Sequence, residues 1–487
     1  MGVFLIAGLS AIAFILAYRL YGRWLGRRIF QLTASRVCPS STFADGVDFV
    51  PTPRTVVLGH HFTSIAGTGP IVGPAIAVMW GWLPAVLWVV FGSIFIGAVH
   101  DLGSLVVSLR NEGQTIGDVA GRLLNRRVRV LFLFILFIGL TIVLAIFGLV
   151  IAVVFRMFPA AIFPCVIQVP LAVVVGIVLR RSGARLLLPS IVALVLMYLA
   201  VIFGDVGWLG SFNVAMAGLP VMMWVFILLG YCFVASVLPV GVLLQPRDYI
   251  NALQLVTALG LIVIGLFVAG LFGGAPVDGT RPPLEIVAPL ADFDPPGAPL
   301  LLPFLFITIA CGAISGFHCL VSSGTSSKQV RSETDAVSIG YGAMILEGFL
   351  AVLVILACVA GLGLGVAEAD GGVVTGEAAW ATRYTSWDAA GGLGAKVGAF
   401  VDGASNFLAA MAVPTSVALA FMGVFVASFA ATTLDTACRL QRYVVQELAS
   451  SASDRWRAAA WSLPGRYIAT GIAVVLGAAL AAIPASG

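Results

Sequence analysis

Long apolar runs, separated by short polar or Gly- and Pro-rich connections, occupy most of this 487-residue sequence. A membrane-spanning helix needs about 20 mainly apolar residues, and the chain contains enough such runs for about twelve spans. Only 10% of the residues are charged and 60% are hydrophobic, which excludes a cytosolic globular enzyme. The sequence therefore predicts an all-α polytopic membrane protein. The expected spans are roughly 3–22, 56–79, 84–109, 130–156, 161–179, 186–203, 220–243, 249–272, 301–325, 337–365, 415–437 and 467–484.

The basic residues indicate which way these spans cross the membrane. When the spans alternate in direction, all but four of the 26 Lys and Arg residues fall on one side, which leaves 22 there. Positively charged loops stay in the cytoplasm, so we expect both termini to face outward. The balance of 26 basic against 22 acidic residues indicates no nucleic-acid partner. The four basic residues on the opposite side are Arg156, Arg281, Arg383 and Lys396.

The second span contains an interruption at its centre. Gly67, Thr68, Gly69 and Pro70 follow one another there, and Gly73 and Pro74 come one turn later. Proline removes a backbone donor and glycine tolerates unwound geometry. Unwound backbone at membrane depth is stable only where protein or a watery cavity satisfies its polar groups, so the break predicts a binding site. The alternative is a kink that serves packing alone.

Span 7 contains a second candidate break, from Leu229 to Gly241, with Pro239 inside it. The two breaks lie five spans apart, an odd number, so the segments that start with them enter the membrane from opposite sides. This pattern is typical of the inverted five-plus-five repeat of secondary transporters. We expect spans 2–6 and 7–11 to form the repeats, and spans 1 and 12 to be peripheral. The expected organisation is one transmembrane unit over 1–487, with segments 1–54, 55–204, 219–449 and 450–487 and a re-entrant piece at 404–413.

Four motifs carry a resemblance to a known family. They are HHFTSIAGTGPIVGP from His60, YCFVASVLPVGVLLQPRDY from Tyr231, ISGFHCLVSSGT from Ile314 and TTLDTACR from Thr432. Together they resemble the carbon starvation protein A (CstA) family, from about residue 20 to residue 450. The resemblance implies a LeuT-like fold of the amino acid/polyamine/organocation (APC) superfamily, a location in the bacterial inner membrane, and uptake of peptides or pyruvate under carbon limitation.

All four histidines lie in apolar spans, at a similar distance from the expected cytoplasmic ends. Ionisable residues within a membrane are costly and are functional candidates by default. We expect a proton-coupling or gating layer, because imidazole titrates near physiological pH. A transition-metal site such as zinc, with the four histidines as ligands, is the alternative, and purely structural histidines are a third. The layer comprises His60, His61, His100, Asp101, His318 and Asp435.

A group of hydroxyl residues ends span 9. Ser322, Ser323 and Thr325 lie about where the eighth core helix of a LeuT-like fold would lie. The resemblance therefore implies a sodium site in which these hydroxyls face backbone carbonyls near Ala66, since hard cations prefer oxygen ligands. Serine and threonine also cap helix ends or hydrogen-bond between helices, so a structural role is the alternative.

For the substrate we expect a carboxylate site at the first break. Free N–H groups and the half-helix dipole around Gly67, Thr68 and Gly69 suit an anion, and Ser64 is close by in the sequence. Tyr231 and Ser236 at the second candidate break are expected to add hydrogen bonds. No buried arginine is expected to compete for this role.

Three charged features have no predicted partner in the substrate site. Arg247 and Asp248 follow span 7 and are expected to form a solvated turn at a cytoplasmic helix end, with a gate ion pair as the alternative. Asp435 and Arg439 lie four residues apart on one helix face, where a local ion pair is expected and a gate latch is the alternative. Glu347 is a lone acid within span 10.

The sequence favours a secondary active transporter that imports small carboxylate-bearing nutrients by alternating access. It would be coupled to H⁺ or Na⁺, and its partners would be the substrate and the lipid bilayer. The alternatives are a membrane-embedded metalloenzyme or metal-binding protein, and a nutrient sensor. No phosphate-binding G-x-x-x-x-G-K-[ST] motif occurs, which disfavours an ATP-driven pump. The choice between peptide and pyruvate, and the oligomeric state, are not predicted.

Overall fold

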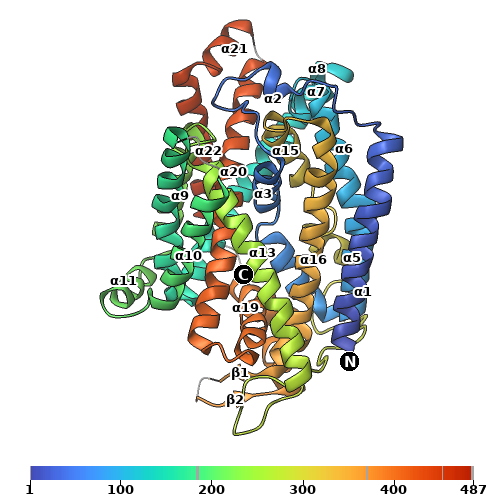
Figure 1. Cartoon of the computed structure of the whole chain (residues 1–487), viewed down its shortest axis with the longest axis vertical. Coiled ribbons are helices and arrows are strands. Elements are labelled where there is room, and N and C mark those ends of the chain that lie inside the picture. The colour runs from blue at the N-terminus through green and yellow to red at the C-terminus, as the bar shows by residue number, and fades with distance from the viewer. Residues whose placement is uncertain (1, 183–185, 369–370, 452, 484–487) are drawn as a thin grey trace.

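The computed structural model describes residues 2–182, 186–368, 371–451 and 453–483, and its helices run mainly along the long axis of the molecule (Figure 1). The helices in the first part of the chain are α1 (Gly2–Leu16), α2 (Pro39–Thr42), α3 (Arg54–Ile65), α4 (Gly69–Ala77), α5 (Trp82–Gly92), α6 (Ala98–Leu109), α7 (Ile116–Leu123), α8 (Arg126–Met157), α9 (Ile162–Ser182), α10 (Leu187–Phe203) and α11 (Trp208–Ala217).

The helices in the second part of the chain are α12 (Val221–Val237), α13 (Leu244–Phe272), α14 (Leu301–Thr308), α15 (Phe317–Gly324), α16 (Gly342–Leu356), α17 (Gly376–Arg383), α18 (Trp387–Gly391), α19 (Leu393–Ala410), α20 (Thr415–Ser450), α21 (Asp454–Ala460) and α22 (Leu463–Ala481). Strands β1 (Val366–Ala367) and β2 (Val373–Val374) form a short antiparallel pair.

Eight helices in the described part of the chain are long and apolar enough to cross a membrane. Two bent helix pairs raise this number to ten if each pair is one span. The remaining two expected spans, 220–243 and 301–325, correspond to the 17-residue helix α12 and to the separate short helices α14 and α15. A predominantly helical structure with at least eight candidate membrane spans is therefore confirmed, whereas the count of twelve spans and the five-plus-five repeat stay predictions. Residue 484, at the end of the last expected span, lies outside the described residues, as do residues 1 and 485–487 of the expected segments.

The break expected in the second span is confirmed. Helix α3 ends at Ile65 and α4 begins at Gly69, and the two axes differ by 46°. Ala66 has left the helical region, with a ψ of 44°, and Pro70 occupies the first turn of α4. Proline is tolerated at that position because the N–H it lacks has no partner in the first turn of a helix.

The break expected in span 7 is wrong in its position. Helix α12 is continuous through Tyr231 and Ser236, and it ends at Val237. Leu238 adopts an extended conformation, which is the conformation favoured by a residue that precedes proline. Pro239 and Gly241 therefore form the connection to α13 and do not interrupt a helix.

A break that the sequence did not predict lies in the expected span 301–325. Residues 309–316 separate α14 from α15, and Gly312 has a φ of 89°. Side chains of the α5 region satisfy two of the freed carbonyls: Trp88 donates from Nε1 to the Ile309 oxygen at 3.1 Å, and Ser93 donates from Oγ to the Gly312 oxygen at 2.8 Å. This arrangement meets the requirement that unwound backbone within a membrane be satisfied by protein.

The two broken segments cross in contact and in opposite directions. A Cβ atom on Gly69 would lie 2.3 Å from the Cβ atom of Cys311, and a Cβ atom on Gly73 would lie 2.2 Å from the carbonyl oxygen of Thr308. Gly69 lies against Cys311, and the later Gly73 lies against the earlier Thr308. The two segments are therefore antiparallel. Only glycine permits backbones to approach this closely.

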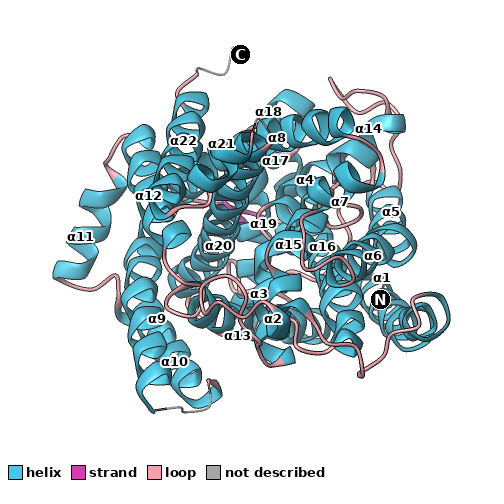
Figure 2. Cartoon of the chain, turned by 90° about the horizontal axis from the view of Figure 1, so that it is seen from above, coloured by secondary structure: helices cyan, strands magenta, loops and turns pink. Residues whose placement is uncertain are grey.

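Helix α20, the longest helix that the structure describes, has 36 residues and a length of about 54 Å. It packs against α8, α12, α19 and α22 and is buried along most of its length. The piece 404–413, expected to be re-entrant, comprises the last part of the buried helix α19 and the turn that leads to α20. Figure 2 shows α11 projecting from the bundle beside α9 and α12; it is bent by 85° from α10, and Trp208 at its start is 76% exposed.

Candidate functional site

A buried arginine lies where the start of α13 meets α12 and α20. Arg247 is 1% exposed and the neighbouring Asp248 is fully buried. The solvated turn expected at these two residues is therefore wrong. The reason is tertiary: α3, α12 and α20 surround the first turn of α13, so that a helix end which carries charge in the sequence lies inside the protein.

The guanidinium of Arg247 has three polar partners from two helices. It forms an ion pair with the carboxylate of Asp435 and donates to the hydroxyl of Tyr231 at 2.6 Å and to Oγ1 of Thr432 at 3.1 Å. The Tyr231 hydroxyl in turn donates to Oδ2 of Asp435 at 3.0 Å. The other carboxylate oxygen of Asp435 accepts no hydrogen bond from the described residues. The site is a buried cation with one carboxylate partner that is incompletely satisfied.

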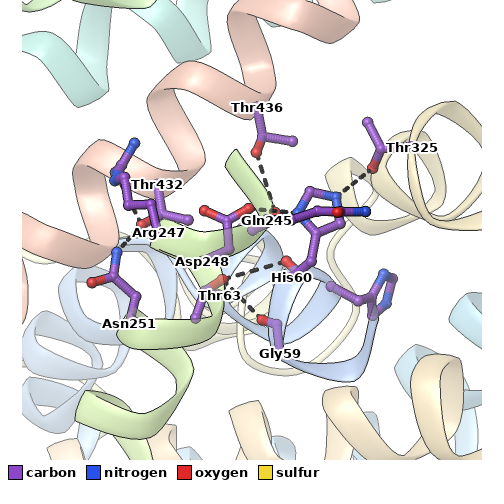
Figure 3. A network of polar contacts seen from close by, with 12 residues as sticks. Gly59, His60, Thr63, Gln245, Arg247, Asp248, Asn251, Thr325, Thr432 and Thr436 are labelled. Carbon is purple, nitrogen blue, oxygen red and sulfur yellow. Dashed lines mark hydrogen bonds and ion pairs between the residues drawn. The ribbon is translucent and has the colours of Figure 1, made fainter. Parts of the chain in front are cut away.

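A histidine and a carboxylate form a second pair beside this one (Figure 3). Nδ1 of His60 lies 2.5 Å from Oδ2 of Asp248, and Nε2 of the same ring lies 3.2 Å from Oγ1 of Thr325. These contacts join α3, α13 and the end of α15. Because Arg247 and Asp248 are adjacent in the sequence, both pairs depend on the same turn of α13.

The end of α3 is fastened to α20 by hydroxyl groups. Oγ of Ser64 lies 3.2 Å from Oγ1 of Thr436, and Thr433 donates to the carbonyl oxygen of Ser64 at 3.1 Å. Thr433 also lies against Gly67, where a Cβ atom would come within 2.6 Å of its Oγ1. The break in span 2 therefore contacts the same stretch of α20 that carries Asp435.

The four histidines do not converge on one point. His61 contacts Oγ of Ser326 through Nδ1 at 2.8 Å, on the same side of α3 as the His60–Thr325 contact. His318 lies in a separate cluster with Asp101, and His100 has a side chain that is 44% exposed and lies 3.6 Å from Asp101. The expected layer thus divides into the His60–Asp248 pair, the Asp435–Arg247 pair and the cluster around His318.

In that cluster Nδ1 of His318 lies 2.9 Å from Oδ2 of Asp101, and Nε2 lies 3.1 Å from Oε2 of Glu347. All three side chains are fully buried. Sγ of Cys311, on the unwound segment after α14, lies 3.9 Å from Nε2 of His318. Glu347, which the sequence presents as a lone membrane acid, therefore has a partner.

The hydroxyls expected to bind sodium make hydrogen bonds within α15. Ser323 donates to the Cys319 carbonyl at 2.7 Å, and Thr325 donates to the Val321 carbonyl at 3.0 Å. Ser322 lies 3.5 Å from the carbonyl oxygen of Asp101. Ala66 ends α3 and is fully buried. The sodium site stays a prediction.

The glycines expected to hold a carboxylate are covered by other segments. Phe147 and Thr433 lie against Gly67, and Cys311 lies against Gly69. The N–H of Gly67 donates to the Ile65 carbonyl at 2.9 Å, and Thr68 precedes the first turn of α4. Of the two residues expected at the second break, Tyr231 reaches the buried arginine, whereas Ser236 is buried beside Cys438.

An ion-pair cluster joins the loop of residues 43–53 to Arg439 and Arg442 of α20. Arg439 donates to Oδ1 of Asp48 at 2.7 Å, and Arg442 lies 3.4 Å from the same oxygen. The local pair expected between Asp435 and Arg439 is therefore wrong, because each residue pairs with a different helix or loop. Burial opposes ionisation of Asp48, but the charges of Arg439, Arg442 and Lys328 hold the pKa of that carboxyl well below its usual range.

Comparisons with known proteins identify sequences that are similar to this chain. The family model "Carbon starvation protein CstA" matches residues 1–486. The chain is 36% identical to the peptide transporter CstA of Campylobacter jejuni, over 72% of this chain and 49% of that protein. It is also 36% identical to the pyruvate/proton symporter BtsT of Escherichia coli, over 72% of this chain and 48% of that protein. The peptide transporter CstA of Escherichia coli is 33% identical over 96% of this chain and 70% of that protein. The chain thus spans about half the length of the first two relatives.

Proposed function

The chain belongs to the carbon starvation protein CstA family, and from this premise we propose that it is a secondary transporter that imports a small carboxylate-bearing nutrient together with protons. We place it in the cytoplasmic membrane of a bacterium, with the Arg-rich connections inside. The relatives bear the names of peptide and pyruvate transporters, and both kinds of substrate carry a carboxylate.

The observation that carries the proposal is the buried pair of Arg247 and Asp435. Guanidinium is always charged and presents a planar fork that matches a carboxylate. In this structure one nitrogen of the Arg247 fork contacts the carboxylate of Asp435, and the other donates to Oγ1 of Thr432. A substrate carboxylate has the same charge and shape, so it can replace Asp435 as the partner of Arg247.

The same exchange provides a route for coupling to protons. When the substrate takes the guanidinium, Asp435 keeps only the hydroxyl of Tyr231 and remains buried. A buried carboxylate without a cation favours its neutral form, so substrate binding and proton uptake would occur together. The ionisable groups that influence Asp435 are Arg247 and Asp248 on α13, Tyr231 and Cys232 on α12, and Arg439 and Cys438 on α20 itself.

The crossing of the two broken segments supports alternating access. Half-helices that meet at glycines can tilt independently, and α3, which precedes the first break, carries His60 and Ser64 to α13 and α20. Tilting of α3 would change both contacts at once. We propose that this motion opens the arginine site to one side of the membrane at a time.

Uptake into liposomes tests the proposal. Purified protein is reconstituted, and entry of labelled pyruvate and of a labelled dipeptide is measured with a proton gradient, with a sodium gradient and with neither. We expect accumulation of one substrate that requires the proton gradient. Accumulation driven only by a sodium gradient would contradict the proposed coupling to protons. No uptake of either substrate under any gradient would favour a sensor or a metal-binding protein.

We propose that the loop of residues 43–53, which Asp48 joins to Arg439 and Arg442, is a gate on the cytoplasmic side. Asp48→Asn removes the carboxylate that two arginines share, and hydrogen bonds to charged groups contribute about 1.5–3 kcal/mol each. We expect Cys438, which is fully buried, to react with a cytoplasmic maleimide about tenfold faster in this variant when it is the only cysteine retained. Glu112→Gln, at an exposed residue of another connection, is the control and should leave the rate unchanged.

The pH dependence of this closure follows from the lowered pKa of Asp48. A carboxyl whose pKa is lowered by folding contributes its full stabilisation above its ordinary pKa and loses it only as the pH falls toward the lowered value. Labelling of Cys438 in the parent protein should therefore be constant between about pH 6 and pH 8, apart from the known reactivity of the thiol itself. A steep increase in Cys438 labelling as the pH falls within that range would contradict this role of Asp48.

A further inference from the structure

The described residues contain one group of three His, Cys, Asp or Glu side chains whose ligand atoms converge closely enough for a metal ion. Sγ of Cys311, one ring nitrogen of His318 and one carboxylate oxygen of Glu347 all lie within 4.8 Å of one another. The three residues come from different elements: the unwound segment after α14, helix α15 and helix α16. The Arg247 site shares none of these side chains.

The hydrogen bond to Asp101 determines which atoms face the centre of this group. The Asp101 carboxylate accepts from Nδ1 of His318 at 2.9 Å, so in the neutral ring Nδ1 carries the proton and the lone pair of Nε2 faces away from Asp101. That lone pair faces Oε2 of Glu347 at 3.1 Å and Sγ of Cys311 at 3.9 Å. Nitrogen, oxygen and sulfur atoms thus face one point, where a single metal ion would contact all three.

A proton alone satisfies this arrangement poorly. Among the described residues, Oε1 of the fully buried Glu347 side chain has no hydrogen-bond partner, and Oε2 makes the 3.1 Å contact with His318. A proton on Nε2 of His318 would satisfy Oε2 of Glu347 but not the other carboxylate oxygen. Two carboxylates, Asp101 and Glu347, are buried around this one imidazole, and a divalent ion would neutralise their charge when both are ionised.

The distances suit a tetrahedral transition metal. Zinc bonds of about 2.3 Å to sulfur and 2.0–2.2 Å to nitrogen and oxygen place neighbouring ligands about 3.3–3.6 Å apart. The nitrogen–oxygen separation of 3.1 Å and the nitrogen–sulfur separation of 3.9 Å bracket this range, and the sulfur–oxygen separation is within 4.8 Å. Asp101 takes the place of the outer carboxylate that orients a metal-bound histidine in many zinc sites.

We propose that Cys311, His318 and Glu347 bind a divalent transition metal, with zinc favoured by the mixed sulfur, nitrogen and oxygen donors, and with Asp101 as a positioning residue. The fourth coordination position is left for water. Cys311 is only partly buried, whereas His318 and Glu347 are fully buried. Because Cys311 lies on the unwound segment that contacts Gly69, the ion would fasten one broken segment to α16.

Metal analysis of the full chain in detergent tests this proposal without reference to transport. The protein is equilibrated with zinc chloride, excess metal is removed, and bound zinc per chain is measured. We expect one zinc ion per chain, and at least about a hundredfold weaker binding in Cys311→Ser and in Glu347→Gln. Cys319→Ser alters a thiol in the same stretch of chain that is outside the group, and it should bind zinc like the parent. Asp101→Asn should weaken binding about 10–100-fold.

Cobalt substitution gives a second readout that depends on the ligand set. Cobalt bound in place of zinc should show thiolate charge-transfer absorption that disappears in Cys311→Ser and remains in Cys319→Ser. No bound zinc in the parent protein, parent-like binding in either Cys311→Ser or Glu347→Gln, or a cobalt spectrum without the thiolate band would each overturn the proposal. A transport defect in the same variants would not support it.

Discussion

Arg247→Gln is expected to reduce uptake at low substrate concentration by at least about a hundredfold. The change removes the guanidinium fork, and hydrogen bonds to charged groups contribute about 1.5–3 kcal/mol each, where 1.4 kcal/mol is tenfold. It also leaves Asp435 buried without a cation. Arg247→Lys keeps the charge but not the fork, so it should be intermediate. The measurement is initial uptake against substrate concentration in liposomes.

The matched control is Arg383→Gln, which breaks an arginine–aspartate pair with Asp402 in a different part of the protein. It should transport normally. If Arg247→Gln, present in the membrane at the parental level, transports like the control, the carboxylate site does not include Arg247.

Asp435→Asn separates substrate binding from coupling in the same site. It removes the charge of the internal competitor while Arg247 keeps hydrogen-bond contacts to Tyr231 and Thr432. Exchange of labelled for unlabelled substrate should therefore persist, whereas accumulation driven by a proton gradient should be lost. Persistence of proton-driven accumulation would remove Asp435 from the coupling step.

Gly69→Leu is expected to abolish uptake. Even a Cβ atom at this position would lie 2.3 Å from the Cβ atom of Cys311, a separation that real side chains do not adopt. The larger side chain would force the two broken segments apart. Gly139→Leu is the control, because nothing lies within 4 Å of a Cβ atom there and the residue is exposed on α8. Uptake and the amount of folded protein are measured for both.

Because Gly69→Leu can fail by unfolding, a compensating pair makes the test specific. Gly69→Ala introduces only the clashing Cβ atom, and Cys311→Gly removes the atom that it meets. The double variant should regain a substantial part of the uptake that Gly69→Ala loses. Equal uptake in Gly69→Ala and the parent protein would contradict the close crossing of the two segments.

The sequence predicted the features that depend on local chemistry. Gly67, Gly69 and Pro70 together predicted the break in span 2, because these residues disfavour a helix wherever they lie. The motifs that resemble the carbon starvation family predicted a membership that the family match confirms. The second break was not predicted, because Gly312 and Gly316 have no proline between them and also fit a packed helix.

The features that depend on tertiary packing could not be predicted in the same way. Arg247 lies near the end of an apolar run, and such a position usually marks a solvated connection. Its burial results from α12 and α20, which are adjacent to it only in the fold. Likewise, His60 was expected among other histidines, but its partner Asp248 is 188 residues away. Contacts between residues so far apart in the sequence cannot be inferred from local sequence patterns.

Helix α20 has a thermodynamic consequence. It carries Asp435 in the arginine site and, one turn later, Arg439 in the ion-pair cluster with Asp48. Because one helix takes part in both contacts, substrate binding and release of the Asp48 loop are coupled equilibria, and such coupling is reciprocal. If release of the Asp48 loop favours the substrate-bound state, then substrate must favour release of the loop by the same free energy. Asp48→Asn should therefore change substrate affinity from a distance, and the shift in dissociation constant would measure the coupling between gate and site.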